Sequence, residues 1–168
     1  MRGKRRKERM ILKNATLHIG NGEVFQGDMR IADGKIVEVG KNINGDESRS
    51  LNGKHVFPGF IDSGNFLGAQ DMAFFAKDYN ENSNPVTPYL DIWHSIDPDE
   101  LSLQELYKAG ITSMLVTPGN EGILGGTCTV VKTKGKNINK ITVKRDAAMK
   151  ASMTSEVIRV FSGKGSPQ

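Results

Sequence analysis

Histidine and cysteine are the side chains of this sequence best suited to hold a metal or act as a nucleophile. His18, His55 and His94 lie far apart in the sequence and form neither a His-x-His nor a His-x-x-x-His pair. Because a zinc ion needs several ligands together, we expect surface or hairpin histidines here. Cys128 is the only cysteine. It has no CxxC partner, and a nucleophilic role would need a neighbouring base, so we expect a small buried strand residue.

Two further polar features follow predicted strands. The segment "PGNEGILGG", residues 118–126, lacks the lysine and GKS/T ending of a phosphate loop. A loop after a strand faces the ligand-binding side of barrels and open sheets, so a substrate loop and a structural turn both stay open. Asp62 could orient a metal ligand or a loop amide, or could cap a turn. With no histidine beside it, we favour the turn cap.

A small β-sheet unit is predicted over residues 10–57. "MILKNATLHI" is apolar with partial alternation, and a glycine turn follows at residues 20–22. Asp33 and Gly34 separate two strand-like runs, which predicts a hairpin because its tight turn needs positive φ at both central residues. These signals predict a β-sheet unit at the start of an α/β chain.

Parallel α/β structure is predicted from residue 58 onward. "GFIDSGNFLG" reads as a strand buried on both faces that restarts after Pro58. Asp97, Pro98 and Glu100 have the spacing of a helix N-cap, a first-turn proline and a capping box. The helix is predicted to end at Gly110 and to be followed by the strand "ITSMLVTPG", so that the three elements form a right-handed βαβ unit.

The rest of this half is less regular. A long loop is predicted over residues 69–96, and such loops are usually functional or mobile. A further strand is predicted at about residues 127–133, with "NINKITVK" as its possible partner. "DAAMKASM" is predicted as a short helix.

Composition limits the class of protein. The 168 residues carry a net charge of +4, but six basic residues lie within residues 1–9, which we predict to be a disordered basic tail. A basic arm of this kind could contact nucleic acid or anionic lipid. No apolar run is long enough for a membrane span, and a single cysteine forms no internal disulfide. We therefore expect a cytoplasmic protein.

Four segments, taken in order, resemble the amidohydrolase superfamily and, within it, the imidazolonepropionase-like branch. They are "ILKNATLHIGNGEVFQGDMRIADGKIVEVG", "GKHVFPGFIDSGNFLG", "NPVTPYLDIWHSIDPDE" and "ELYKAGITSMLVTPGNEGILGGTCTVVKTKG". The resemblance implies β-sandwich strands followed by the first βα units of an incomplete metal-dependent-hydrolase (TIM-like) barrel, with an inserted loop at 69–96. It also implies hydrolysis of C–N bonds in cyclic amides with zinc or another divalent metal.

Applied residue by residue, the resemblance places the two metal-binding histidines of the family motif on Gly64 and Phe66. Neither residue offers a ligand atom, so no metal ligand or catalytic residue is predicted in this chain. A metal is expected only if the missing ligands are supplied elsewhere. Asp62 is then expected to orient neighbouring groups. The expected substrate contacts are Asn65, Gly119, Asn120, Gly125 and Gly126.

Three functions remain open from the sequence. The chain could be the N-terminal portion of an amidohydrolase-like protein, inactive alone because the histidines and later barrel strands are missing. It could be one subunit of a split barrel, completed by a second copy or by a C-terminal polypeptide. It could also be a non-catalytic binding module with a nucleic-acid-contacting arm, although the body carries no nucleic-acid motif.

Overall fold

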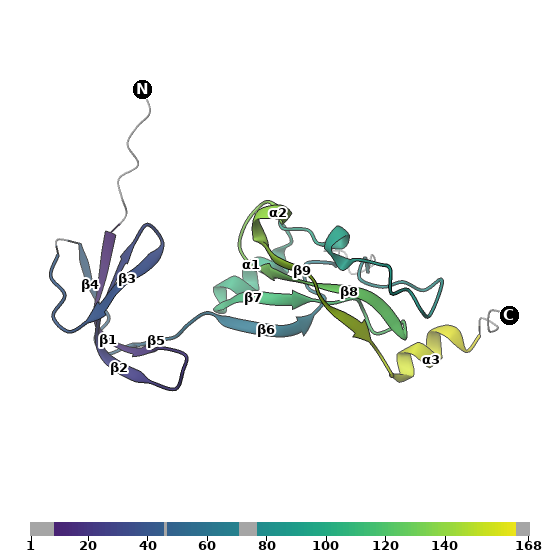
Figure 1. Ribbon diagram of the computed structural model, residues 1–168, viewed down its shortest axis with the longest axis horizontal. Helices are drawn as coiled ribbons and strands as arrows, with labels where there is room; N and C mark the ends of the chain where they lie inside the picture. Colours follow the sequence, from purple (N-terminus) through teal and green to yellow (C-terminus); the bar gives the residue numbers. More distant parts are fainter. Residues whose placement is uncertain (1–8, 46, 71–76, 164–168) are drawn as a thin grey trace, which may run out of the picture. The chain divides into compact units, whose positions relative to one another are not determined.

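The structure is a computed structural model of the chain, and it describes residues 9–45, 47–70 and 77–163. The chain divides into two compact units, with the boundary between Pro58 and Gly59 (Figure 1). Each unit has its own sheet. None of the helices in the described residues has the length and apolar character needed to span a membrane.

The first unit is a five-stranded sheet in the order β3-β2-β1-β4, with β5 also paired to β1. Its strands are β1 (Arg9–His18), β2 (Val24–Ala32), β3 (Lys35–Gly40), β4 (Ser48–Ser50) and β5 (His55–Val56). Strands β1, β2 and β3 are antiparallel neighbours, whereas β4 and β5 run parallel to β1. Asp33 and Gly34 both have positive φ between β2 and β3, which confirms the predicted hairpin.

A small apolar cluster supports this sheet. Ala15, Leu17 and Met29 are buried together on β1 and β2. Next to them the buried Asp28 carboxylate accepts hydrogen bonds from the backbone N–H groups of Asn14 (2.9 Å) and Ile43 (3.0 Å). The carboxylate can be buried because these two amide donors satisfy its oxygen atoms.

The start of β1 differs from the sequence prediction. Arg9 was predicted to lie in a disordered tail, but it begins β1 and pairs with Ala32. Residues 1–8 lie outside the described residues, so the predicted basic arm remains a prediction.

The second unit contains a four-stranded sheet in the order β6-β7-β8-β9. Its elements are β6 (Phe60–Asn65), η1 (Ile92–Ser95), α1 (Leu101–Lys108), β7 (Ile111–Val116), β8 (Leu124–Lys132), α2 (Ile138–Ile141), β9 (Thr142–Ala151) and α3 (Ser155–Phe161). Strands β6 and β7 are parallel and joined through α1, which confirms the predicted βαβ unit. Strands β7, β8 and β9 are antiparallel. Within the described residues, barrel-type parallel pairing is therefore limited to β6 and β7, and a complete barrel remains an expectation.

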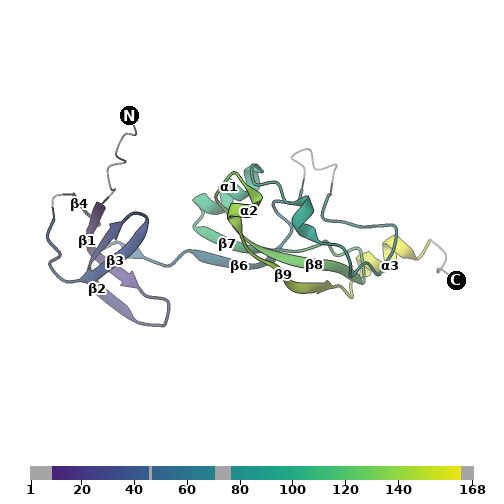
Figure 2. The same ribbon diagram turned by 45° about the horizontal axis from the view of Figure 1, so that its top comes forward.

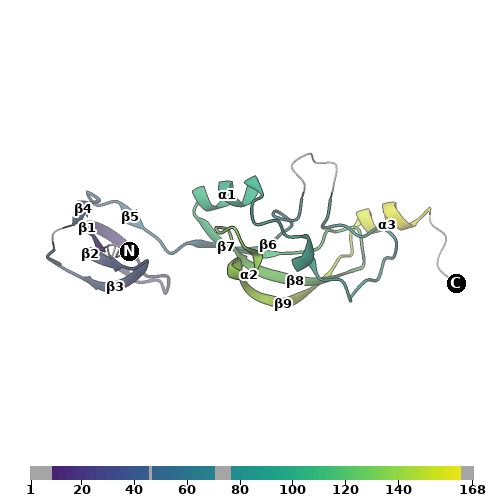
Figure 3. The ribbon, with the colours of Figure 1, turned by 90° about the horizontal axis from the view of Figure 1, so that it is seen from above.

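The core of this unit lies on one face of the sheet. Met114 and Val116 of β7 and Val131 of β8 are fully buried, and Leu103 of α1 and Ile141 of α2 pack into the same cluster. Figure 2 shows α1 and α2 above the strands, in agreement with this packing. Figure 3 shows α3 beyond the end of the sheet, near the C-terminus.

The predicted helix forms, but its start is displaced. The helix begins at Leu101, with Glu100 at the N-cap position making no side-chain cap hydrogen bond. Asp97 instead accepts the N–H of Asp99 (2.9 Å) in a turn that precedes the helix. Gly110, with φ of 90°, follows the last turn as predicted. The prediction of a capping box that begins at Asp97 is therefore wrong, because a local turn at Asp97 competes with the first helical turn.

The predicted short helix "DAAMKASM" is also wrong. Most of this segment belongs to β9, where Met149 pairs with Thr127 and Ala148 pairs with Cys128 of β8. Alanine, methionine and lysine favour helices, but pairing with a neighbouring strand overrides this weak preference. A helix does form later, at α3.

Candidate functional site

A turn built around Asp62 closes the C-terminal end of β6. One carboxylate oxygen of Asp62 accepts the N–H of Gly64 (2.9 Å), and the other accepts the side-chain amide of Asn65 (2.5 Å). The Asn65 side-chain oxygen then accepts the N–H of Leu67 (2.8 Å). Both side chains are partly buried and engaged within the turn. The structure thus gives Asp62 the geometry of a turn cap that also orients Asn65.

Gly64 is in the last part of β6 and Phe66 directly follows the strand, at the positions where the family resemblance implies metal ligands. A Cβ added at Gly64 would lie 3.4 Å from the Thr117 methyl carbon, which is ordinary van der Waals contact. The Phe66 ring is stacked on Tyr79, with centroids 4.2 Å apart and an angle of 21° between the planes. These two residues supply no nitrogen, oxygen or sulfur from their side chains, so they do not fit a metal centre.

Tyr79 is held in an acidic, partly buried environment. Burial raises the pKa of the Tyr79 hydroxyl, and the nearby charges of Glu121 and Glu156 raise it further. The hydroxyl therefore stays protonated and cannot serve as an anionic ligand near neutral pH. In the part of the chain that the structure describes, no three His, Cys, Asp or Glu side chains are grouped so that they could hold a metal ion.

The glycines of the 118–126 loop lie against the preceding irregular segment. Gly119 donates its N–H to the Tyr79 carbonyl (2.8 Å), and a Cβ at Gly119 would overlap the side-chain oxygen of Asn80. Gly126 has a φ of 107°, and a Cβ there would overlap the carbonyl oxygen of Leu90. At these two positions the absence of a Cβ lets the loop lie close to Asn80 and Leu90, as expected if the loop is a structural turn.

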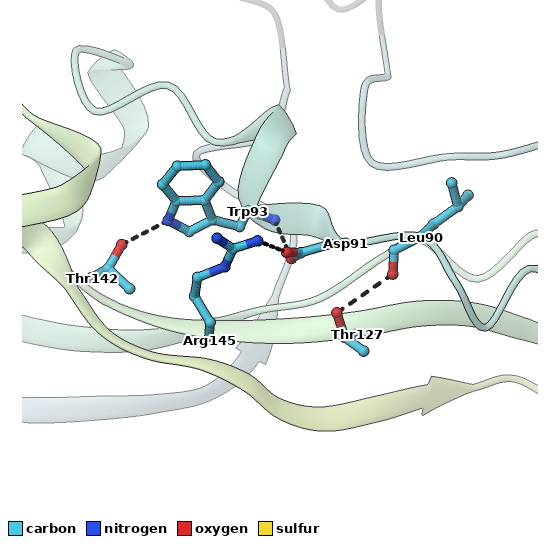
Figure 4. Close-up of polar contacts among 6 residues, drawn as sticks. All are labelled: Leu90, Asp91, Trp93, Thr127, Thr142 and Arg145. Atoms are coloured by element: carbon cyan, nitrogen blue, oxygen red, sulfur yellow. Dashed lines mark hydrogen bonds and ion pairs between the residues drawn. The ribbon is translucent and has the colours of Figure 1, made fainter.

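Segment 85–96 is attached to β8 and β9 by several polar contacts (Figure 4). The Leu90 carbonyl accepts hydrogen bonds from the N–H (2.8 Å) and hydroxyl (3.4 Å) of Thr127. Trp93 donates its indole N–H to the Thr142 hydroxyl (2.9 Å). The Arg145 guanidinium lies 4.3 Å from the centre of the Trp93 ring, a cation–π distance.

Asp91 completes this attachment. Its carboxylate accepts the N–H of Trp93 (2.9 Å) and forms an ion pair with Arg145. Burial alone would raise the pKa of Asp91. The hydrogen bonds from Arg145 and Trp93, together with the charges of Arg145 and His94, outweigh burial and lower that pKa below its usual value. Asp91 is thus held as a carboxylate that fastens the segment to β9.

Two cavities lie near the ends of β7 and β8. The larger, of about 400 Å³, is lined by residues 78–81 and 89–92, His94, Ser95, Pro118 and Gly125. A smaller one, of about 110 Å³, is lined by Phe66, Asn120 and neighbouring residues. The predicted substrate residues of this loop therefore have different surroundings. Gly125 and Asn120 each border a cavity. Gly119 instead contacts Tyr79 and Asn80, and Gly126 contacts Leu90.

Apart from the 118–126 loop, the residues that line the larger cavity were not identified from the sequence. Tyr79, Tyr89 and Asp91 come from the segment predicted as an inserted loop. Arg145, which does not line the cavity but pairs with Asp91, comes from a strand predicted partly as a helix. The only signal for them was the concentration of aromatic and acidic residues within a long loop, which is typical of functional segments.

Cys128 behaves as expected for a structural residue. Its side chain is buried on β8, with 2% exposed. Burial raises the pKa of the thiol, and the charge of Lys150 offsets this only in part. The thiolate needed for nucleophilic attack is thus disfavoured at this position.

Comparison with known proteins provides one informative similarity. No protein-family model matches the chain, and no curated protein matches it. The crystal structure of an amidohydrolase from Thermotoga maritima MSB8 is similar, with a TM-score of 0.83 and 29% sequence identity. The alignment covers 92% of this chain but only 42% of that protein. The similarity supports an amidohydrolase-like fold, of which this chain spans a part.

Proposed function

We propose that the chain is an amidohydrolase-like protein of the imidazolonepropionase-like branch whose own residues do not hold the catalytic metal. The similarity to an amidohydrolase structure and the parallel β6–α1–β7 unit support the fold. The observation that carries the proposal is the C-terminal end of β6 and the residue that follows it. There Gly64 has no side chain, and the ring of Phe66 packs against Tyr79 at the second ligand position.

A divalent metal in such hydrolases activates a bound water and polarises the amide carbonyl. The side chains at positions 64 and 66 could not place an ion at the end of β6. Asp62 has both carboxylate oxygens engaged within its own turn, so it orients Asn65 and supplies no metal ligand. The role proposed for this chain is therefore scaffolding and small-molecule contact, through the cavity bordered by Gly125.

The direct test is hydrolysis by the unchanged chain. We expect no zinc-dependent turnover of five- and six-membered cyclic amides. Hydrolysis with stoichiometric zinc, abolished by a chelator, would overturn the proposal.

A gain-of-ligand variant sharpens the test. The double substitution Gly64→His with Phe66→His introduces the His-x-His pair of the family motif, and a Cβ at position 64 makes only ordinary contact with Thr117. It should gain zinc binding that the matched control, Gly64→Ala with Phe66→Ala, lacks. Both variants should also carry His18→Ala and His55→Ala, so that other histidines do not contribute. Equal zinc binding by the two would contradict the assigned ligand positions.

A second proposal is that the sheet is completed by another copy or another polypeptide. The end strands β6 and β9 carry exposed apolar side chains: Ile61 is 74% exposed, Val143 56% and Met149 47%. Exposed apolar groups on end strands favour association. Light scattering should show self-association that increases with concentration. A monomer at high concentration would exclude the homo-oligomeric form of this proposal.

A further inference from the structure

Two of the three histidines of this chain meet in the first unit, whereas Gly64 and Phe66 belong to the second. His18 is the last residue of β1, and His55 is the first residue of β5. These strands are parallel, with Thr16 opposite His55 and Leu17 opposite Val56. His18 is therefore the diagonal neighbour of His55 on one face of the sheet, within reach of a long side chain.

The two imidazole rings have a defined mutual orientation. The Nε2 atom of His18 and the Nδ1 atom of His55 are 2.8 Å apart and share a hydrogen bond, and their ring planes differ by 26°. His18 also stacks on Phe57, with centroids 4.0 Å apart and planes 16° apart. The stacking limits rotation of the His18 ring, and the strand pairing fixes the separation of the two backbones. His55 is exposed and His18 is partly exposed, so a dissolved ion can reach both.

The separation of the two nitrogen atoms suits a particular class of metal ion. Imidazole nitrogen binds a first-row divalent ion at about 2.0–2.1 Å, so two ligands at right angles are about 3.0 Å apart and two at a tetrahedral angle about 3.4 Å apart. The observed 2.8 Å is therefore a few tenths of an ångström from the right-angle arrangement. Square-planar and octahedral ions such as Cu²⁺ and Ni²⁺ use right angles and take imidazole readily.

We propose that His18 and His55 form a two-histidine site for a divalent ion of octahedral or square-planar preference, with Ni²⁺ as the probe ion. The ligands are the Nε2 atom of His18 and the Nδ1 atom of His55. The ion replaces the hydrogen bond between these two nitrogens, both rings turn so that their lone pairs meet at the ion, and the proton of each neutral ring is then on its other nitrogen. Water completes the coordination. The site lies within residues 9–58 and is independent of the amidohydrolase function proposed above.

The third histidine provides a matched control. His94 is an exposed residue of η1 in the second unit, with no other histidine near it in the sequence. Isothermal titration of the whole chain with Ni²⁺ should show saturable binding of one ion. His94→Ala should bind Ni²⁺ as the unchanged chain does, whereas His18→Ala and His55→Ala should each lose the saturable phase. Zn²⁺, which prefers the wider tetrahedral angle, should bind more weakly than Ni²⁺.

A second measurement does not depend on the variants. Because octahedral Ni²⁺ is paramagnetic, it should broaden the amide resonances of β1 and β5 in the unchanged chain before those of the second unit. Circular dichroism checks that each variant is folded. The proposal fails if the unchanged chain shows no saturable Ni²⁺ binding, if His18→Ala and His55→Ala bind as tightly as it does, if Zn²⁺ binds as tightly as Ni²⁺, or if the broadening lies elsewhere.

Discussion

Substitution of Gly126 by alanine separates a structural role of the 118–126 loop from substrate contact. Gly126 has a φ of 107°, a conformation that an alanine adopts only with strain. The added Cβ would overlap the Leu90 carbonyl oxygen and lie 2.9 Å from its carbon. Since the same carbonyl accepts the Thr127 N–H at 2.8 Å, segment 85–96 must move away and this hydrogen bond must weaken.

The expected loss of stability follows from these contacts. A strained φ costs about 1–3 kcal/mol, overpacking about 1–3 kcal/mol, and a lost hydrogen bond about 1 kcal/mol. Relief of one cost reduces the others, so we expect the free energy of unfolding to fall by about 3 kcal/mol. With a urea dependence of about 1–3 kcal/mol per molar, the unfolding midpoint of the second unit should fall by about 1–3 M.

Gly122→Ala is the matched control in the same loop. Its φ is not positive, and the nearest atom to an added Cβ lies 3.5 Å away, so its stability should change by no more than about 0.5 kcal/mol. The assay is urea unfolding followed by Trp93 fluorescence, with amide hydrogen exchange at Thr127. If Gly126→Ala and Gly122→Ala unfold at the same urea concentration and Thr127 stays protected, the close approach of Leu90 is wrong.

Three further outcomes follow from the attachment of segment 85–96 and from β8. Folding lowers the pKa of Asp91, so its contribution to stability is present above the ordinary pKa of 3.8 and is lost as the pH falls through the folded value. Asp91→Asn and Arg145→Ala should therefore both reduce the pH dependence of the free energy of unfolding over that acidic range. Trp93→Phe, which removes the hydrogen bond to the Thr142 hydroxyl, should cost about 1 kcal/mol in urea unfolding. Adding Thr142→Val should cost a further amount of about the same size, because that hydroxyl also donates to the Ile138 carbonyl (2.7 Å); no further loss would contradict this second bond. Cys128 should resist alkylation in the folded chain and react in urea, since its thiol is buried; rapid reaction without denaturant would contradict this.

The attachment contacts also explain why a long irregular segment can have a defined position. Segment 85–96 is joined to β8 by isolated bridges and a few backbone hydrogen bonds, such as Thr87 N–H to the Leu124 carbonyl (2.8 Å), and side-chain contacts add to them. The Asp91–Arg145 pair is partly exposed, and such pairs contribute little alone. Stacking of Arg145 on Trp93 and the bond from Trp93 to Thr142 add to it, so the position of the segment rests on several weak contacts acting together.

Local sequence was sufficient for several parts of the fold. The Asp33-Gly34 hairpin and the β6–α1–β7 unit were predicted from turn residues and apolar patterns, because these signals act between residues close in sequence. The expectation that positions 64 and 66 supply no metal ligand also needed no structure, since the types of these two residues decide it. The family resemblance itself was carried by ordered motifs, and the amidohydrolase structure supports its fold.

Tertiary structure decided the features that depend on residues far apart in sequence. Segment 146–151 became part of a strand because β8 offered a partner, and no local pattern contains that partner. Gly126 is constrained by Leu90, 36 residues earlier, through backbone contact. The sequence presented His18 and His55 as isolated histidines. Parallel pairing of β1 and β5 brings their ring nitrogens together, because strand register joins residues that chain order separates.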